Sequence, residues 1–264
     1  MEIKKEEILI MQLWTKEHAI SVLPALAIML LLCAVFRIAL RKKSLETRMI
    51  PFKIVAIVVV LLEIGKQVLS FRQGYDLYHI PLHYCSLFIF MLPIMAFYRG
   101  KHQAKIGCIT AAICSAVFLM MLIYPNLIYG SWNVINYFEG YFDFHTVTVH
   151  LLIMFAFLLI PTLELHTPAK KGEQKAVIIF IICFCAVSAT AAQLLETNYN
   201  NFYVCNIPPL EAVRQAVEAV TGTLLAKIFY VLCVTVMDIL FTTGAYWFYR
   251  GLRRLVVGKV ATPV

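Results

Sequence analysis

The stretch AISVLPALAIMLLLCAVFRIALRKK, residues 19–43, decides the fold class of this chain. Residues 19–40 are almost wholly apolar, and a helix of about 20 apolar residues spans the ~30 Å hydrocarbon core of a bilayer. Three bases follow at once, which is typical of the cytoplasmic end of a transmembrane helix. The stretch therefore predicts a membrane-spanning helix whose carboxyl end faces the cytoplasm.

Six further apolar runs follow, and together they predict an all-α bundle of seven transmembrane helices in one domain, residues 1–264. The chain is 61% hydrophobic and 14% charged, whereas soluble domains are about 45–50% apolar and about 25% charged. This composition excludes a soluble enzyme, a disordered protein and a small disulfide-rich scaffold. The expected spans are 19–40, 50–71, 81–98, 106–124, 145–164, 176–195 and 228–249.

Basic residues alternate between the loops, and this alternation predicts the orientation of the chain. Most of the 23 bases lie at or beyond the carboxyl end of the first, third, fifth or seventh run: Arg37, Arg41, Lys42, Lys43, Arg48, Lys53, Arg99, Lys101, Lys105, Lys170, Lys171, Lys175, Arg250, Arg253, Arg254 and Lys259. The positive-inside rule then places the N-terminus outside and the C-terminus in the cytoplasm. Because topology accounts for the net charge of +8, we predict no binding to nucleic acid.

Ionisable residues in the second run mark the first candidate site. Glu63, Lys66 and Gln67 lie in its expected outer half. Glu63 and Lys66 are three residues apart, so they share one face of a helix. Polar groups inside a membrane span are costly and indicate a function by default. The pattern fits either a buried ion pair that fixes helix packing or the wall of a polar pocket.

A cysteine and two histidines open two other runs on the same expected side. The third run begins HIPLHYCS, residues 79–86, where Pro81 predicts the first turn of a helix. The fifth begins with His145 and His150. Counting 1.5 Å per residue places Cys85 ~6 Å and His150 ~7.5 Å below their helix starts, hence at similar depth. A cysteine facing a histidine is the minimal arrangement for nucleophilic acyl transfer.

Other residues near this site allow more than one interpretation. In a helix His83 and Cys85 would point to nearly opposite faces, which makes His83 a poor base for the thiol. Asn198 and Tyr199 follow the sixth run on the same side. They fit either substrate binding or a loop in the aromatic belt of the membrane. Alternatively, Cys85 and Cys205 form a disulfide on the oxidising side of the membrane.

Cofactor motifs are absent from the sequence. It contains no Walker loop, dinucleotide glycine fingerprint, HExxH or GxSxG, and no CxxC pair. We therefore predict no cofactor and no metal site.

Residues 57–205 resemble a family of bacterial integral membrane proteins of the YwaF type. The resemblance rests on EIGK at 63–66, Gly74, PLHYC at 81–85, FH at 144–145, His150 and TNY at 197–199. It departs at Tyr84 and Ser86, where the family usually has leucine and an acid. It implies a helical bundle in the bacterial cytoplasmic membrane, distantly similar to androgen-induced membrane hydrolases. It also implies kinship with an animal transmembrane acyltransferase that acts on ether phospholipids.

Two hypotheses for function follow. In the first, implied by the resemblance, the protein is a lipid acyltransferase or acyl hydrolase with membrane lipids as substrates. Cys85 is then the nucleophile and His150 or His145 the base, while the substrate contacts are His83, Asn198, Tyr199, Glu63 and Lys66. In the second, the polar residues of the spans line the path of a transporter or a solute-binding protein without catalysis.

Overall fold

The computed structural model describes residues 16–125, 139–167, 172–205 and 208–257, and every regular element in these ranges is helical. This confirms the predicted all-α class. The α-helices are α1 (Lys16–Leu40), α2 (Leu45–Arg48), α3 (Ile50–Arg72), α4 (Leu87–Phe97), α5 (Gln103–Ile123), α7 (Tyr141–Thr162), α8 (Glu173–Leu194), α9 (Pro208–Thr221) and α10 (Thr223–Val257). Short 3₁₀ turns occur at Leu77–His79 (η1), Tyr84–Ser86 (η2) and Tyr199–Asn201 (η4).

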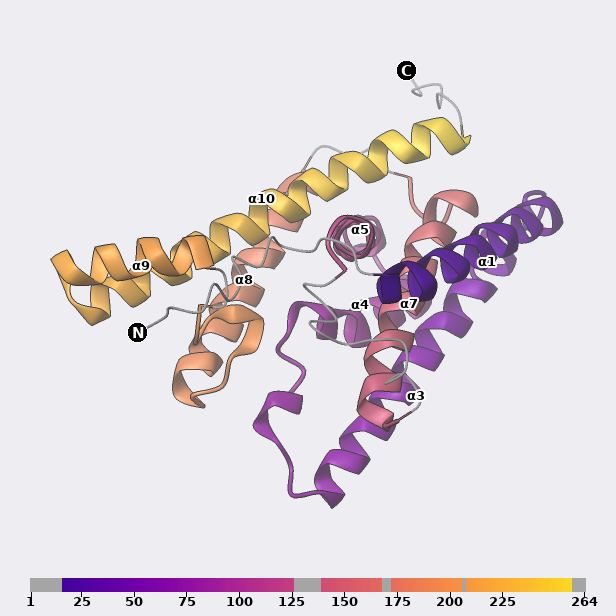
Figure 1. The fold of residues 1–264 in the computed structure, drawn as a ribbon. Helices are drawn as coiled ribbons and strands as arrows, with labels where there is room; N and C mark the ends of the chain where they lie inside the picture. The colour runs from indigo at the N-terminus through magenta and orange to yellow at the C-terminus, as the bar shows by residue number, and fades with distance from the viewer. Residues whose placement is uncertain (1–15, 126–138, 168–171, 206–207, 258–264) are drawn as a thin grey trace.

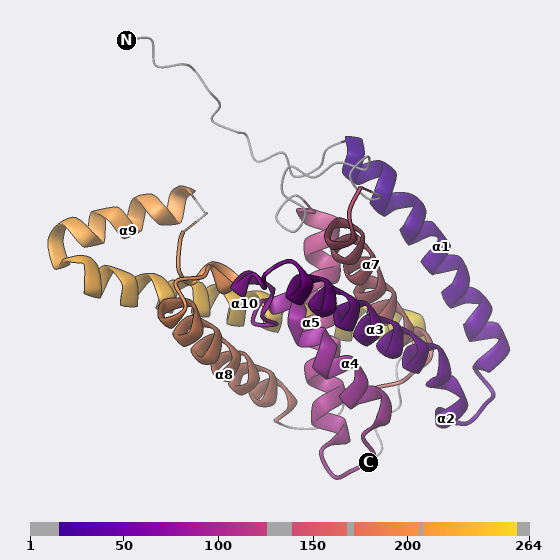
Figure 2. The same cartoon turned by 90° about the horizontal axis from the view of Figure 1, so that it is seen from below.

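Six of these helices are long and apolar enough to span a membrane: α1, α3, α5, α7, α8 and α10. Their ends lie within a few residues of the predicted ones, except that α10 extends well beyond 228–249. α5 and α7 form the centre, because 67% of the most apolar 18-residue stretch of each helix is buried. The corresponding share for α1 is only 17%. α1 packs at the edge against α7 (Figures 1 and 2). Exposed apolar side chains such as Ile38 (79%) and Leu194 (77%) then face lipid.

The predicted third helix, residues 81–98, is wrong in its first third, residues 81–86. The α-helix here is α4, which begins at Leu87 and has 11 residues. At 1.5 Å per residue it is only ~16 Å long, too short to cross a bilayer alone. Pro81 therefore does not lie in a helical first turn. It belongs to a non-helical segment, residues 73–86, that contains only the turns η1 and η2.

Hydrogen bonds from neighbouring helices hold the 73–86 segment in place. Gln67 of α3 donates to the His79 carbonyl at 2.7 Å, and Ser188 of α8 donates to the Leu82 carbonyl at 2.8 Å. The Tyr84 and Thr242 hydroxyls are bonded to each other at 2.8 Å, which attaches the segment to α10. Non-helical backbone is tolerated at membrane depth only where protein satisfies its polar groups. These contacts supply such partners where a helix would have bonded to itself.

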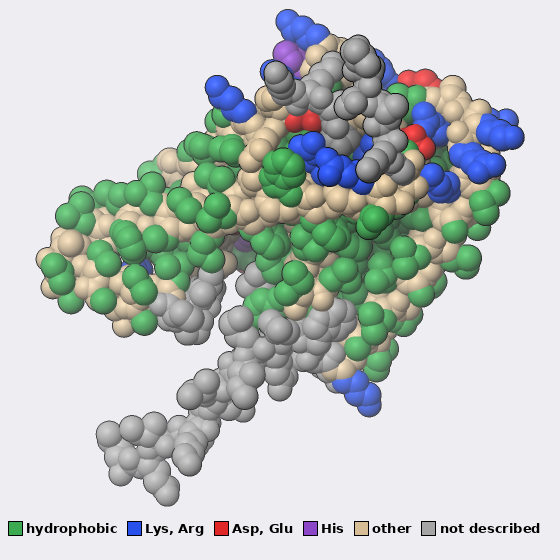
Figure 3. Space-filling view, turned by 90° about the horizontal axis from the view of Figure 1, so that it is seen from above, with side chains coloured by type: hydrophobic (Ala, Val, Ile, Leu, Met, Phe, Trp, Pro, Cys, Tyr) green, Lys and Arg blue, Asp and Glu red, His purple; other side chains and the backbone are tan. Residues whose placement is uncertain are grey.

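Basic side chains gather at one end of the bundle, as Figure 3 shows from one side. Arg37 donates to the carbonyls of Thr162 and Val256, at the carboxyl ends of α7 and α10. Arg48 donates to the Leu163 carbonyl at 2.8 Å. Cations at helix carboxyl ends satisfy free carbonyls and complement the helix dipole. The contacts thus bring together loops that were predicted to share one side; which side of the membrane they face stays a prediction.

The helix α9 is amphipathic and folds back along the start of α10 (Figures 1 and 2). Gly222 makes the turn between them with a φ of +82°, a conformation that glycine adopts without strain. On the polar face Arg214 bonds to Glu211 at 2.7 Å and to Glu218 at 2.6 Å. An amphipathic helix of this kind suits the surface of a membrane.

Candidate functional site

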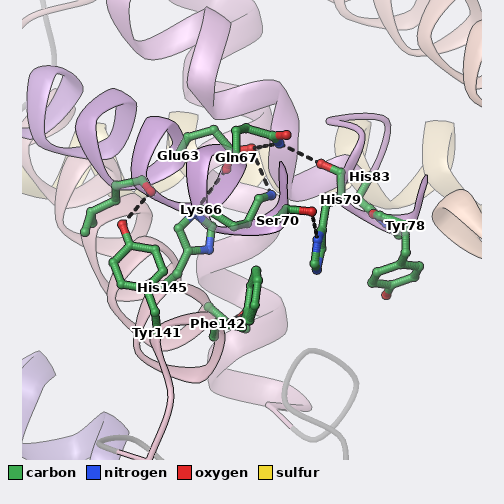
Figure 4. A network of polar contacts seen from close by, with 12 residues as sticks. Glu63, Lys66, Gln67, Ser70, Tyr78, His79, His83, Tyr141, Phe142 and His145 are labelled. Carbon is green, nitrogen blue, oxygen red and sulfur yellow. Dashed lines mark hydrogen bonds and ion pairs between the residues drawn. The ribbon is translucent and has the colours of Figure 1, made fainter. Parts of the chain in front are cut away.

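Glu63 is the centre of the polar contacts at the end of α3. The residue is 6% exposed, and Oε1 of its carboxylate lies 2.8 Å from the Lys66 ammonium. Its other oxygen lies 3.0 Å from Nε2 of His145, which comes from the first turns of α7 (Figure 4). A buried carboxylate is tolerated when it has both a charge partner and hydrogen bonds. The structure contains the Glu63–Lys66 ion pair, one of the two alternatives that the sequence left open. The contact between Glu63 and His145 attaches α3 to α7.

Gln67 and His79 extend these contacts to the 73–86 segment. Gln67 donates to Glu63 at 2.7 Å and accepts a hydrogen bond from the Tyr75 hydroxyl at 3.0 Å. Nδ1 of His79 lies 2.7 Å from the Ser70 hydroxyl. We call the connected set the Glu63 network; it comprises Glu63, Lys66, Gln67, Ser70, Tyr75, His79 and His145.

Two aromatic residues at the start of α7 lie against this network. The Tyr141 hydroxyl donates to the Leu62 carbonyl at 2.8 Å and lies directly over Gly65, where a Cβ would be 2.2 Å from it. The Phe142 ring stacks on the His79 ring with 4.6 Å between centroids. Figure 4 shows both rings below α3. The start of α7 therefore contacts both α3 and the segment that carries Cys85.

His83 lies outside the Glu63 network, next to two tyrosines. Its Nε2 is 3.2 Å from the Tyr78 carbonyl, and its ring contacts the Tyr78 ring at 4.4 Å and the Tyr199 ring at 5.5 Å. Because residues 81–86 are not α-helical, the predicted opposition of His83 and Cys85 across a helix no longer applies.

Cys85 and His150 are the predicted nucleophile and base. Cys85 is a half-buried free thiol in η2, just before α4. His150 lies one and a half turns beyond His145 on α7 and is 6% exposed. Its Nδ1 is 2.6 Å from the Thr146 carbonyl. A carbonyl can only accept, so Nδ1 carries a proton and the lone pair of a neutral ring lies on Nε2.

Asn198 and Tyr199 hold the loop after α8 in shape. Asn198 accepts hydrogen bonds from the backbone N–H groups of Tyr203 and Val204. Tyr199 is fully buried and its hydroxyl donates to the Leu77 carbonyl. Cys85 and Cys205 are not joined by a disulfide in the structure.

The next residue of that loop, Asn200, donates to Asp238 of α10 at 2.7 Å. Asp238 also accepts from the Cys185 thiol at 3.6 Å. The acid in the middle of the last span therefore has polar partners from the loop and from α8.

Sequence reasoning missed Ser70 and Tyr141. Ser70 had a detectable signal, because Glu63, Lys66, Gln67 and Ser70 follow the i, i+3, i+4, i+7 spacing of one helix face. Tyr141 had none, since its role depends on how closely α7 approaches the bare Cα of Gly65.

The fold and the site define a multi-pass helical membrane protein with a buried polar network at one end of its bundle. A family model matches residues 13–246, and it is the model of the TMEM164 family. The chain therefore belongs to the TMEM164 family. No curated protein and no solved structure gives a significant match.

Proposed function

We propose that this protein is a membrane-embedded lipid acyltransferase or acyl hydrolase with Cys85 as nucleophile and His150 as general base. His145 is the alternative base. Membrane lipids are the substrates, and the protein acts in the bacterial cytoplasmic membrane, in the half of the bilayer away from the basic end of the bundle.

The observation that carries this proposal is the direct contact between the segment of Cys85 and the helix of the two histidines. His79 of this segment stacks on Phe142 of α7. From α3, Gln67 bonds to the segment and Glu63 contacts α7. If the cysteine and histidines lay on opposite sides of the bundle, neither histidine could take the proton of the Cys85 thiol. The sequence resemblance to a transmembrane phospholipid acyltransferase supports the same chemistry.

The reaction has two balanced steps. His150 takes the thiol proton of Cys85 through Nε2, and the thiolate attacks the ester carbonyl carbon of a phospholipid. The ester C–O bond breaks, and the leaving lysophospholipid takes the proton from the imidazolium. The hydroxyl of an acceptor lysophospholipid, or water, then gives its proton to His150 and attacks the thioester. The C–S bond breaks and the thiolate regains the proton.

The polar residues near Cys85 position the substrate in this proposal. Lys66 supplies a cation for a phosphate headgroup, and Glu63 holds it in place. His83 supplies a ring nitrogen to the substrate. Asn198 and Tyr199 act through the loop they shape, which contacts the 73–86 segment at Leu77.

The test is acyl exchange by the purified protein in lipid nanodiscs, with a labelled diacyl phospholipid as donor and a lysophospholipid as acceptor. We expect Cys85→Ala to reduce transfer to background. We expect His150→Ala to lower the rate by about 10²–10⁴, the usual contribution of a general base. The matched control is Cys183→Ser, because Cys183 is an exposed thiol on α8.

Undiminished transfer by Cys85→Ala would overturn the proposal. A large loss in His145→Ala with normal turnover in His150→Ala would reverse the assignment of the base. Uptake of a solute into proteoliposomes, abolished by Glu63→Gln and unaffected by Cys85→Ala, would favour the transporter instead.

A further inference from the structure

A second group of polar residues lies at the opposite end of α7 from His145. It consists of Cys108 on α5, His166 just after α7 and Glu173 at the start of α8, and all three are buried. α7 has 22 residues, which is ~33 Å of helix. This group is therefore separate from the Glu63 network, and it lies where Arg48 contacts the end of α7.

The side chains of this group converge. One donor atom from each residue lies within 4.8 Å of the other two. A tetrahedral zinc ion with bonds of about 2.0–2.3 Å holds such atoms roughly 3.3–3.8 Å apart. Small side-chain rotations would close the remaining distance.

Two atoms of the group are buried without hydrogen-bond partners among the residues that the structure describes. They are Nε2 of His166 and Oε1 of Glu173, on side chains of residues only 6% and 5% exposed. Buried polar atoms are normally satisfied, and an exception indicates a missing ion or water. The position of Glu173 at a helix N-terminus explains the presence of an acid, but not its direction towards a buried thiol and imidazole.

Neighbouring residues hold two of the three side chains in place. The Tyr246 hydroxyl donates to the other oxygen of Glu173 at 2.7 Å. The His166 ring stacks on Tyr249 and faces Gly107, where a Cβ would be 2.7 Å from Nδ1. Groups that orient metal ligands in this way are a regular part of metal sites.

Two arginines near the group form no ion pair with Glu173 in the part of the chain that the structure describes, and Nε of Arg253 is itself buried there without a hydrogen-bond partner. Arg253 donates to the Thr167 hydroxyl at 3.1 Å, and Arg250 lies over the Trp247 ring at 4.6 Å. Neither arginine is a hydrogen-bond partner of Oε1 of Glu173. A thiolate and a carboxylate together carry two negative charges, which one divalent cation would balance.

We propose that Cys108, His166 and Glu173 bind one zinc ion. Thiolate, imidazole and carboxylate are all zinc ligands, and three protein ligands leave a fourth position for water. The ion connects α5, the residues after α7 and the start of α8. It stabilises the end of the bundle opposite the Glu63 network, and the proposal is independent of acyl transfer.

The test measures zinc directly in the full-length protein, purified in detergent without chelators. We expect one zinc per chain by mass spectrometry, and loss of zinc in Cys108→Ser and His166→Ala. Tyr246→Phe should weaken zinc binding about 10–100-fold in competition with a chromophoric chelator. Cys114→Ser, a buried thiol on the same helix, is the control that should keep its zinc.

Cobalt substitution supplies a second readout that needs no activity. Cobalt bound by wild-type protein should show a thiolate-to-metal charge-transfer band, which Cys108→Ser should lack. The proposal is overturned if monodisperse wild-type protein binds no zinc at micromolar concentration. It is equally overturned if Cys108→Ser and His166→Ala bind zinc as the wild type does.

Discussion

At the scale of single residues, Glu63 shows how an acid survives in a membrane span. Burying a carboxylate is costly, and the cost is offset only when a charge partner and hydrogen bonds accompany it. Lys66, Gln67 and His145 supply these contacts. Each partner therefore depends on the others, and removing one leaves a charge or a donor buried alone.

Lys66→Met should destabilise the protein strongly because it leaves the charge of Glu63 without its cation. The expected loss is about 3–5 kcal/mol. The double variant Glu63→Gln/Lys66→Met should lose much less than the sum of the two single variants. Thermal unfolding in detergent measures all four proteins. Additive losses would show that the pair is not coupled.

Gly65→Ala should destabilise the protein, although alanine favours a helix over glycine by roughly 0.5–1 kcal/mol. The new Cβ would displace the Tyr141 hydroxyl from the Leu62 carbonyl, which costs about 1–3 kcal/mol. Gly244→Ala is the matched control, because open space surrounds its Cβ position on α10. We expect opposite changes in melting temperature, and equal changes would refute the close contact.

At the scale of elements, the 73–86 segment marks the limit of what the sequence could predict. Apolar runs fixed six spans because a long helix satisfies its own backbone. The third run, residues 81–98, was equally apolar, and Pro81 fits a helical first turn. The segment departs from a helix where Gln67, Ser188 and Thr242 supply contacts from elements distant in sequence. No local pattern reveals such partners.

Ser188→Ala tests whether these contacts hold the segment. It removes the donor to the Leu82 carbonyl and should cost about 1–3 kcal/mol. Thr190→Ala is the control, because Thr190 is exposed and bonds only to Ala186 in its own helix. Hydrogen exchange of residues 73–86 should rise in the first variant alone. Unchanged exchange would mean that Ser188 does not anchor the segment.

Glu46 predicts a pH dependence for the turn between α1 and α3. Arg99 and then Lys53 bond to its carboxylate and lower its pKa to about 2 from an ordinary value of 4.5. The carboxylate therefore stabilises the fold above pH 4.5, and this contribution is lost as the pH falls towards 2. At pH 7 the wild type should have a higher melting temperature than Glu46→Gln, and this difference in melting temperature should become smaller by pH 3. A constant difference would contradict this.

At the scale of the whole molecule, the charge pattern predicted which loops lie together. Arg99 contacts Glu46 at 2.8 Å, next to the start of α3. Arg72 lies at the other end of α3, ~33 Å from its start. The chain thus travels the length of the bundle between Arg72 and Arg99, through the 73–86 segment and α4. We predict that this is the third crossing of the membrane.

With seven crossings, the two termini face opposite sides of the membrane. We expect a green fluorescent protein fused to the C-terminus to be fluorescent in the cytoplasm, and an alkaline phosphatase fused there to be inactive. Six crossings would place both termini on the same side. An external tag on the N-terminus, labelled in intact cells, distinguishes the two topologies.

The candidate site was predictable in composition but not in its connections. Glu63, Lys66 and His145 stand out because charged or polar side chains are rare in apolar runs. The packing of α3 against α7 determines that Glu63 pairs with His145 and that Phe142 stacks on His79. Cys108, His166 and Glu173 gave no signal, since Cys108 is far from the other two in sequence and none of the spacings is typical of metal ligands.

The central claim is that Cys85 carries an acyl group during turnover. The most direct measurement incubates the purified protein with a labelled phospholipid donor, without acceptor, and analyses the trapped protein by mass spectrometry. We predict an acyl adduct on the peptide that contains Cys85, released by hydroxylamine as expected for a thioester, and absent from Cys85→Ala. Acyl transfer at the wild-type rate by Cys85→Ala, with no adduct on the wild type, would contradict the claim.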